Sequence, residues 1–178
     1  MNGASAALLR VATFLRFSRV LLALLVLAPA RAEAQQLVGG GEAALATGLA
    51  GGGGGETTIE RARTRLRSGA EFWVDEFPKD IFNVSLLAEL EPHSSFGMDL
   101  RYVRRVGDKL TVNVGAVGFI YPESLLGPTC GARYELGLTK GVRGLIGAEV
   151  DVFAIGTDLP PDSVVWQVLL EVGVHVDL

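Results

Sequence analysis

Apolar and polar residues alternate with a period of two along most of the chain after residue 80. The alternation is clearest in six windows, at residues 81–91, 96–103, 110–121, 130–139, 145–154 and 164–178. Of the 33 even-numbered positions in these windows, 32 are apolar and the other is a glycine, whereas the 33 odd-numbered positions include 10 apolar and 10 charged residues. Successive side chains of a β-strand point to opposite faces, whereas a helix would place apolar residues three or four apart. The pattern therefore predicts six β-strands, each with one apolar face.

Residues 57–75 continue this alternation. Five apolar residues share one parity, and the other parity carries five charged residues: the apolar set is Ala62, Leu66, Ala70, Phe72 and Val74, and the charged set is Arg61, Arg63, Arg65, Arg67 and Glu71. Turn-forming residues at 92–95, 107–109 and 140–144 separate the later strands, and we expect longer loops at 122–129 and 155–163. Short connections favour antiparallel neighbours, and a meander of such strands closes most readily into a barrel. We therefore expect an all-β fold, an antiparallel up-and-down β-barrel over residues 57–178.

The number of strands is expected to be even, and eight is the closest even number. Only seven strand segments are evident, so the eighth remains to be placed. Residues 57–75 could hold two strands folded near Ser68 and Gly69, or a strand could precede Glu56. The segment at 35–56 is rich in glycine, with five in a row at 51–55. Because glycine loses much backbone entropy on ordering, we expect this segment to be a flexible tether with at most one weak helical turn around Glu42 to Ala46.

Residues 1–34 resemble a cleaved export signal. Three arginines and no acid precede an apolar run at 20–30, and a small-x-small site ends at Ala34. Eleven apolar residues would span only about 16 Å as a helix, roughly half of a bilayer core. A basic start, a short apolar core and a small-residue cleavage site are typical of a secretory signal peptide.

Composition narrows the functional classes. The whole chain of 178 residues has a net charge of −4, and removal of residues 1–34 would leave 144 residues with a charge of −7. An acidic chain is a poor match for nucleic acid, which we do not expect as a partner. One Cys and two His argue against disulfide frameworks and metal centres, and we expect no cofactor.

Alternation alone does not say which face of the barrel points inward, but the polar face does. The chain has three lysines, all in expected turns, while the polar face is rich in arginine, carboxylates and glycine. Such a face fits a crowded lumen with paired charges, and the apolar face with its terminal aromatics fits a lipid belt. We therefore expect a transmembrane barrel whose lumen network comprises Arg63, Arg65, Glu89, Asp99, Arg101, Arg133, Glu135, Glu149, Asp151 and Glu171.

The last strand carries a family resemblance. The segment VVWQVLLEVGVHVDL ends the chain and is similar to the final strand of small bacterial outer-membrane β-barrels of the OmpA and OmpX type. In that family the final alternating strand is an assembly signal, here carried by Val172, Val174, Val176 and Leu178. The resemblance implies a Gram-negative outer-membrane location, with lipid, lipopolysaccharide, the barrel-assembly machinery and periplasmic chaperones as partners. It favours a structural or surface-interaction role. Because an eight-stranded interior is just wide enough for side chains to fill, we expect the charges to plug the porin-like lumen and not to form an ion pathway.

Two other functions are compatible with the sequence. A soluble periplasmic lipocalin-like barrel would bury the same apolar face around a small apolar ligand. An outer-membrane hydrolase similar to lipid A deacylases would use a His-x-Ser arrangement, which His93 and Ser95 match with Glu91 nearby. A His-Ser-Ser turn is common in loops, so we expect no enzymatic activity.

The windows 130–139 and 145–154 should form one hairpin. If it folds about Val142, Arg133 lies opposite Asp151, with Glu149 as a diagonal neighbour.

Overall fold

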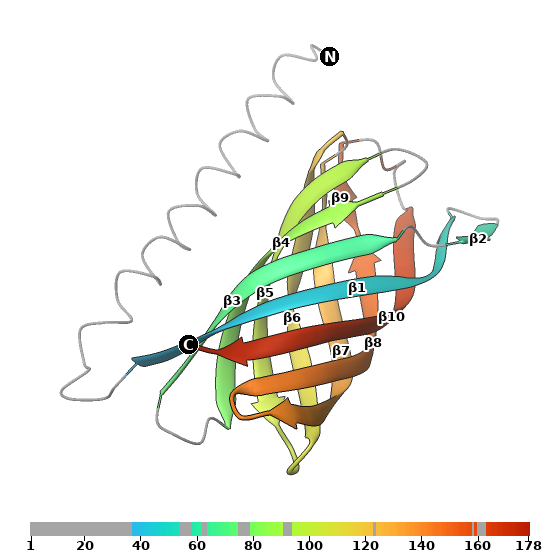
Figure 1. Ribbon diagram of the computed structural model, residues 1–178. Coiled ribbons are helices and arrows are strands. Elements are labelled where there is room, and N and C mark those ends of the chain that lie inside the picture. Colours follow the sequence, from blue (N-terminus) through green and yellow to red (C-terminus); the bar gives the residue numbers. More distant parts are fainter. Residues whose placement is uncertain are drawn as a thin grey trace, which may run out of the picture. The chain divides into compact units, whose positions relative to one another are not determined.

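The computed structural model describes residues 37–53, 58–61, 64–74, 79–90, 94–122, 124–157, 159 and 163–178. The expected signal peptide lies outside these residues. Among the described residues, no helix is long and apolar enough to cross a membrane. The strands are β1 (Leu37–Gly53), β2 (Thr58–Arg61), β3 (Arg65–Val74), β4 (Asp80–Glu89), β5 (Ser95–Arg105), β6 (Leu110–Tyr121), β7 (Leu125–Thr139), β8 (Val142–Phe153), β9 (Ile155–Gly156) and β10 (Val164–Asp177) (Figure 1).

All strand pairs are antiparallel, and the sheet closes on itself. Consecutive long strands are neighbours from β3 to β8, β10 follows β8, and β1 pairs with both β3 and β10. Figure 1 shows β1 lying between β3 and the red β10. The closed ring has eight long strands, while the short β2 and β9 pair only with β1 and β7. This is the expected all-β meander barrel, and closure removes free sheet edges.

The glycine-rich segment is a strand, so the expected flexible tether at 35–56 is wrong for its described part. Residues 37–53 form β1, the longest strand, with no helical turn at Glu42. β1 has a continuous ladder with β10 from Gly40 to Gly53 and another with β3. Leaving out β1 would expose unpaired backbone groups on both neighbours, and in lipid each such group costs several kcal/mol. Backbone pairing on two sides thus outweighs the entropy that the glycines lose.

The eighth strand therefore precedes Glu56. Ser68 and Gly69 lie in the middle of β3, so the chain does not fold back there. Within 57–75 the described residues form the short β2 and the long β3.

The two faces of the barrel have opposite chemistry. Leu86, Val114 and Leu170 on the outer face are 56%, 56% and 67% exposed, whereas Arg65 and Asp151 on the inner face are 0% exposed. From β4 onward the even positions face outward, as the alternation requires. A soluble lipocalin-like barrel needs the reverse arrangement, so the structure contradicts that alternative. An apolar outer surface around a charged interior is the arrangement of a transmembrane β-barrel.

Two expected loops are shorter than the sequence indicates. β7 begins at Leu125, so residues 125–129 belong to a strand and not to a loop at 122–129. Pro128 masks this strand in the sequence, because proline is unusual inside a sheet. The ladder between β7 and β8 starts only at Thr129, so Pro128 pairs with β6 but not with β8. Likewise, Ile155 and Gly156 of the expected loop at 155–163 form β9 against β7.

Strand direction sorts the connections between two ends of the barrel. The connections β3–β4, β5–β6 and β7–β8 lie at the end where β1 begins and β10 finishes, which we call the terminal end. The β7–β8 turn is only Lys140 and Gly141, and Gly141 has a φ of 78°, which favours glycine. The other end, which we call the loop end, holds the longer connections together with β2 and β9.

A charge on the outer face tests this placement. Val150 lies on the outer face of β8, opposite Cys130 of β7 and Val168 of β10. We expect Val150→Arg to cost about 2–4 kcal/mol of unfolding free energy in a bilayer, since a midplane arginine must be buried in hydrocarbon. Val106→Arg, at an exposed position in the β5–β6 connection, should cost about 0–1 kcal/mol. Urea titrations in lipid vesicles measure both, and equal costs would contradict a lipid belt at Val150.

Candidate functional site: the charged barrel interior

The inner faces of the long strands bring a set of charged side chains together inside the barrel. Eight carboxylate residues there are buried, namely Glu42, Glu71, Glu89, Asp99, Glu135, Glu149, Asp151 and Glu171. Among the residues whose side chains the structure describes, four arginines are equally buried, namely Arg65, Arg67, Arg101 and Arg133. Carboxylates outnumber guanidinium groups, so each buried arginine contacts at least two carboxylates. The planar guanidinium, with five N–H donors, suits such bridging.

Arg65 organises the part of the interior nearer the loop end. Its Nη2 lies 2.9 Å from Glu89 Oε1, and its Nη1 lies 2.6 Å from Asp151 Oδ2 and 3.1 Å from Glu149 Oε1. It also donates to Gln167 Oε1 at 2.5 Å. Arg65 on β3 thereby connects its neighbour β4 with β8 and β10 across the lumen.

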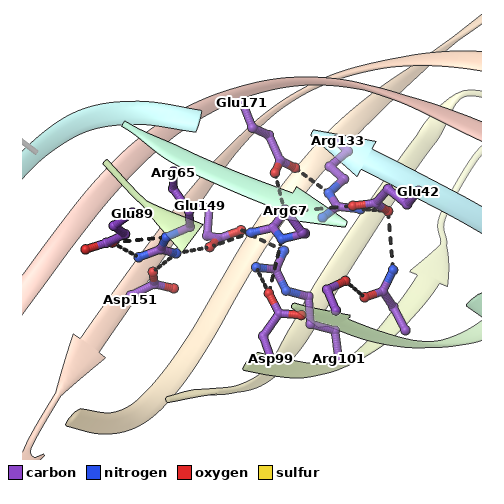
Figure 2. Close-up of polar contacts among 12 residues, drawn as sticks. Glu42, Arg65, Arg67, Glu89, Asp99, Arg101, Arg133, Glu149, Asp151 and Glu171 are labelled. Atoms are coloured by element: carbon purple, nitrogen blue, oxygen red, sulfur yellow. Dashed lines mark hydrogen bonds and ion pairs between the residues drawn. The ribbon is translucent and has the colours of Figure 1, made fainter. Parts of the chain in front are cut away.

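Glu149 is the centre of the network. Its carboxylate lies 2.7 Å from Arg67 Nη2 and 2.6 Å from Arg101 Nη1, in addition to the contact with Arg65. Figure 2 shows Glu149 between Arg65 on one side and Arg67 on the other. Asp99 also bridges Arg67 and Arg101. It lies 3.1 Å from Arg67 Nε and 2.7 Å from Arg101 Nη2. Three arginines thus converge on the Glu149 carboxylate. This arrangement is stable in a dry interior only because each arginine also contacts at least one other carboxylate.

Arg133 binds carboxylates other than those expected. Its Nη1 lies 2.7 Å from Glu42 Oε2 on β1, and its Nε contacts Glu171 Oε1 on β10 (Figure 2). The expected hairpin register is wrong, because Arg133 lies opposite Gly147 while Asp151 lies opposite Thr129. The turn is centred on Lys140 and Gly141, and a register irregularity lies between Gly137 and Thr139. These two features shift the pairing by four residues from a fold about Val142.

A second group of ion pairs lies toward the terminal end. His175 is buried, with Nδ1 2.7 Å from Glu71 Oε2 and Nε2 2.8 Å from Asp177 Oδ1. Arg143 then joins Asp177 at 2.7 Å to Glu135 at 2.9 Å.

Glu135 belongs to the expected network but does not contact the arginines around Glu149. It contacts Arg143 and, at 2.9 Å, Arg105, and both arginines are about one-fifth exposed.

Apolar side chains occupy the lumen on both sides of the charges. Toward the loop end a buried cluster consists of Leu87, Val117, Phe119 and Phe153, with Leu125 and Val165 packed against it. The Arg65 guanidinium lies 5.3 Å from the centroid of the Phe119 ring, at the boundary between this cluster and the charges. Toward the terminal end a second cluster consists of Trp73, Ile81 and Val103. The network is thus enclosed by apolar groups along the barrel axis.

Glycines on the inner face make room for the arginines. A Cβ at Gly147 would lie 2.8 Å from Arg133 Cγ and 3.1 Å from Glu171 Oε1. A Cβ at Gly40 of β1 would lie 2.7 Å from His175 Cε1 and 2.9 Å from Trp73 Cη2. Because Gly40 has no side chain, residues of β10 and β3 meet across the intervening β1, with the Trp73 and His175 rings 5.8 Å apart.

The structure places nearly all the expected network residues in the lumen. Arg63 lies outside the described residues, and the other nine are buried on inner faces. The predicted network did not include Arg67, Glu42 or Glu71, which the structure also buries in the lumen. Arg67 has the same parity as Arg65, and this alone predicts that it faces the lumen. Glu42 was not predicted, because its segment was expected to be a flexible tether and not a strand. The final-strand residues Val172, Val174, Val176 and Leu178 are on the outer face and 39–88% exposed.

The described residues give little support to catalytic or metal chemistry. No group of three or more His, Cys, Asp or Glu among them is arranged to hold a metal ion. His93 and Glu91 of the hydrolase hypothesis lie outside the described residues. Ser95 is 7% exposed on the inner face of β5, turned away from the lipid on which such an enzyme acts.

Comparisons with known proteins return distant structural similarity only. No protein-family model and no curated protein matches the chain. The crystal structure of Neisserial surface protein A from Neisseria has 16% sequence identity and a TM-score of 0.46, over 82% of this chain and 100% of that one. A structure reported under de novo design of transmembrane β-barrels has 11% identity and a TM-score of 0.42, over 76% of this chain and 95% of that one. The fold assignment therefore rests on the closed sheet of this chain.

The corrected register yields a specific energetic test. We expect Arg133→Ala to cost about 3–5 kcal/mol of unfolding free energy, because it leaves Glu42 and Glu171 buried with one partner fewer. Glu171→Ala in the same chain should recover part of that loss, whereas Asp151→Ala should not. Double-mutant cycles from urea midpoints measure the two couplings. A larger coupling for Asp151 than for Glu171 would contradict the register.

The contact across β1 can be tested with two neighbouring glycines. Gly40→Val should displace His175 or Trp73 and cost about 1–3 kcal/mol of unfolding free energy. Gly41→Val is the matched control, because nothing lies within 4 Å of a Cβ at Gly41. Urea midpoints of the two variants should therefore differ clearly. Equal midpoints would show that residues of β3 and β10 do not meet across Gly40.

Proposed function

We propose that the protein is an outer-membrane β-barrel with a structural or surface-interaction role. The observation that carries the proposal is the inversion of the usual protein interior, with arginines and carboxylates inside and an apolar outer surface on all sides. In water that surface would be a large exposed apolar area, which soluble monomers avoid. In a bilayer it is the surface that lipid chains cover.

The proposed lumen is a plug and not a pathway. Eight-stranded barrels have interiors just wide enough for side chains to fill. Here the ion pairs around Glu149 lie between the Phe119 cluster and the Trp73 cluster, so an ion would have to break paired charges and also pass apolar groups. No catalytic residue is assigned.

The proposed route to the membrane is export followed by assembly. Residues 1–34 would direct export, and periplasmic chaperones and the barrel-assembly machinery would then receive the chain. The outward-facing Val172, Val174, Val176 and Leu178 of the last strand would be the assembly signal. The proposed orientation has the terminal end in the periplasm and the loop end, with its longer connections, toward lipopolysaccharide and the cell exterior.

Fractionation of expressing cells and gel mobility test the proposal together. The protein should remain with the outer membrane, need detergent for extraction, and change its gel mobility when boiled. The anomalous mobility depends on the closed barrel resisting detergent until heat opens it. The same preparation should give no stepwise conductance in a planar bilayer. Folded monomer in the soluble periplasmic fraction would overturn the membrane location, and regular conductance steps would overturn the plug.

A further inference from the structure

The three lysines of the chain occupy equivalent places in the fold. Lys79 directly precedes β4, Lys109 directly precedes β6, and Lys140 directly follows β7. All three are exposed, and each lies in a different connection of the terminal end. We call them the lysine rim. Because each lysine is adjacent to a strand end, the backbone holds it at the edge of the sheet.

The outer face next to the rim has the character of a membrane–water interface. Phe72, Phe82 and Tyr102 lie side by side on β3, β4 and β5, and the last two rings are 5.7 Å apart. Lys109 Nζ lies 6.0 Å from the centroid of the Tyr134 ring on β7. Aromatic side chains gather where hydrocarbon gives way to headgroups, and lysine stems extend along apolar surface while the ammonium reaches polar groups.

Asp80 and Asp177, at strand ends near the rim, are engaged with other partners, whereas Asp108 is exposed beside Lys109 and residues 75–76 lie outside the described part of the chain. Asp80 accepts a hydrogen bond from the Tyr102 hydroxyl at 2.6 Å and lies 3.9 Å from Arg104. Arg143 pairs with Glu135 and Asp177. Within the part of the chain that the structure describes, no ion pair joins a carboxylate to a lysine of the rim. Among the described residues, no carboxylate thus competes at ion-pair distance with an anion from outside the protein.

The connections of the loop end have a different charge composition. By sequence, residues 54–64, 90–94, 122–124 and 154–163 contain six acidic residues, two arginines and no lysine. Exposed lysine is thus confined to one end of the barrel, although nothing in a strand-and-turn fold requires it there. Lysine is therefore placed at one end of the barrel only, and the loop-end connections carry an excess of acidic residues.

We propose that the lysine rim binds the phosphate groups of anionic glycerophospholipids in the leaflet at the terminal end. This inference rests on the proposed function, since it requires the barrel to span a bilayer. Three ammonium groups at one end of the barrel, near outward-facing aromatic side chains, match a layer of phosphates just outside the hydrocarbon. A net negative lipid, such as phosphatidylglycerol, would be preferred over a zwitterionic one because its phosphate charge is not neutralised by its own headgroup. Binding at three separate turns would fix the depth of the barrel in the bilayer.

Lipid selection measures the inference directly. The chain from residue 35 onward is refolded into vesicles of equimolar phosphatidylcholine and phosphatidylglycerol. Native mass spectrometry then gives the ratio of the two lipids retained by the folded barrel. The wild type should be enriched in phosphatidylglycerol, and K79Q/K109Q/K140Q should lower the enrichment by about fivefold for each lysine that contacts the lipid surface. The triple arginine variant K79R/K109R/K140R should keep it, and R61Q is the control for loss of a positive charge in a loop-end connection.

A second readout follows the lysines themselves in the unaltered protein. Acylation of amines by a water-soluble reagent, read by peptide mass spectrometry, should be slower at all three lysines in phosphatidylglycerol vesicles than in phosphatidylcholine vesicles. Added glycerol phosphate should not restore the rate, which separates a lipid headgroup from a soluble phosphate. Equal lipid ratios for the wild type and the triple glutamine variant, or equal acylation rates in the two vesicles, would overturn the inference. Flotation with the vesicles and heat-dependent gel mobility are recorded on each sample, so failure to span a bilayer is distinguished from failure to select a lipid.

Discussion

The structure depends on one constraint, which is that an ionised side chain in a dry interior must have partners of opposite charge. Within the described part of this barrel the constraint is severe, because six buried carboxylates, Glu42, Glu89, Asp99, Glu149, Asp151 and Glu171, share four buried arginines. Glu149 meets it with three guanidinium groups that come from β3 and β5, on the far side of the ring from β8. Such contacts exist only if the sheet closes at one diameter and in one register. Buried ion pairs are weak evidence of net stability, but a wrong pairing leaves an isolated charge at a cost of several kcal/mol. The network therefore selects one register among many that the apolar outer face would tolerate.

The sequence predicts the strands and their faces well, because alternation of side chains is a local property of a strand. The inner position of Arg101 or Asp99 follows from parity once one face is assigned to lipid. The partners of a given charge are not predictable in this way. Arg133 was expected to meet Asp151, but a two-residue turn and one irregularity near Leu138 move the register by four residues. Local sequence signals locate a turn only weakly, whereas the pairing partner of every charged residue beyond the turn depends on the position of that turn.

β1 escaped prediction for a different physical reason. Its glycines make the isolated segment a poor strand former, and local propensity indicates a tether. Two neighbouring strands supply its hydrogen bonds, which is information that no window of the sequence contains. The absent side chains have a use in the folded barrel, because Gly40 leaves room for His175 and Trp73, and a Cβ at Gly51 would overlap the Trp166 ring. Large aromatic side chains of β3 and β10 thus pack over β1, whose glycines contribute no side chains of their own.

The junction between β1 and β10 joins the first and last strands, and this has a consequence for the order of events in time. Arg133 contacts Glu42 across a separation of 91 residues, and Arg67 contacts Glu171 across 104. The contacts to Glu171 cannot form before the final strand is available, so an incomplete chain lacks a partner for Arg67 and for Arg133. Folding with such non-local contacts is slow, because chain entropy is lost before the contacts repay it. Until the last fourteen-residue strand arrives, the charged residues are better solvated in an unfolded chain than in an open sheet. A half-made barrel is therefore disfavoured by the same charges that fill the finished one, so an incomplete chain would insert into a bilayer unfavourably.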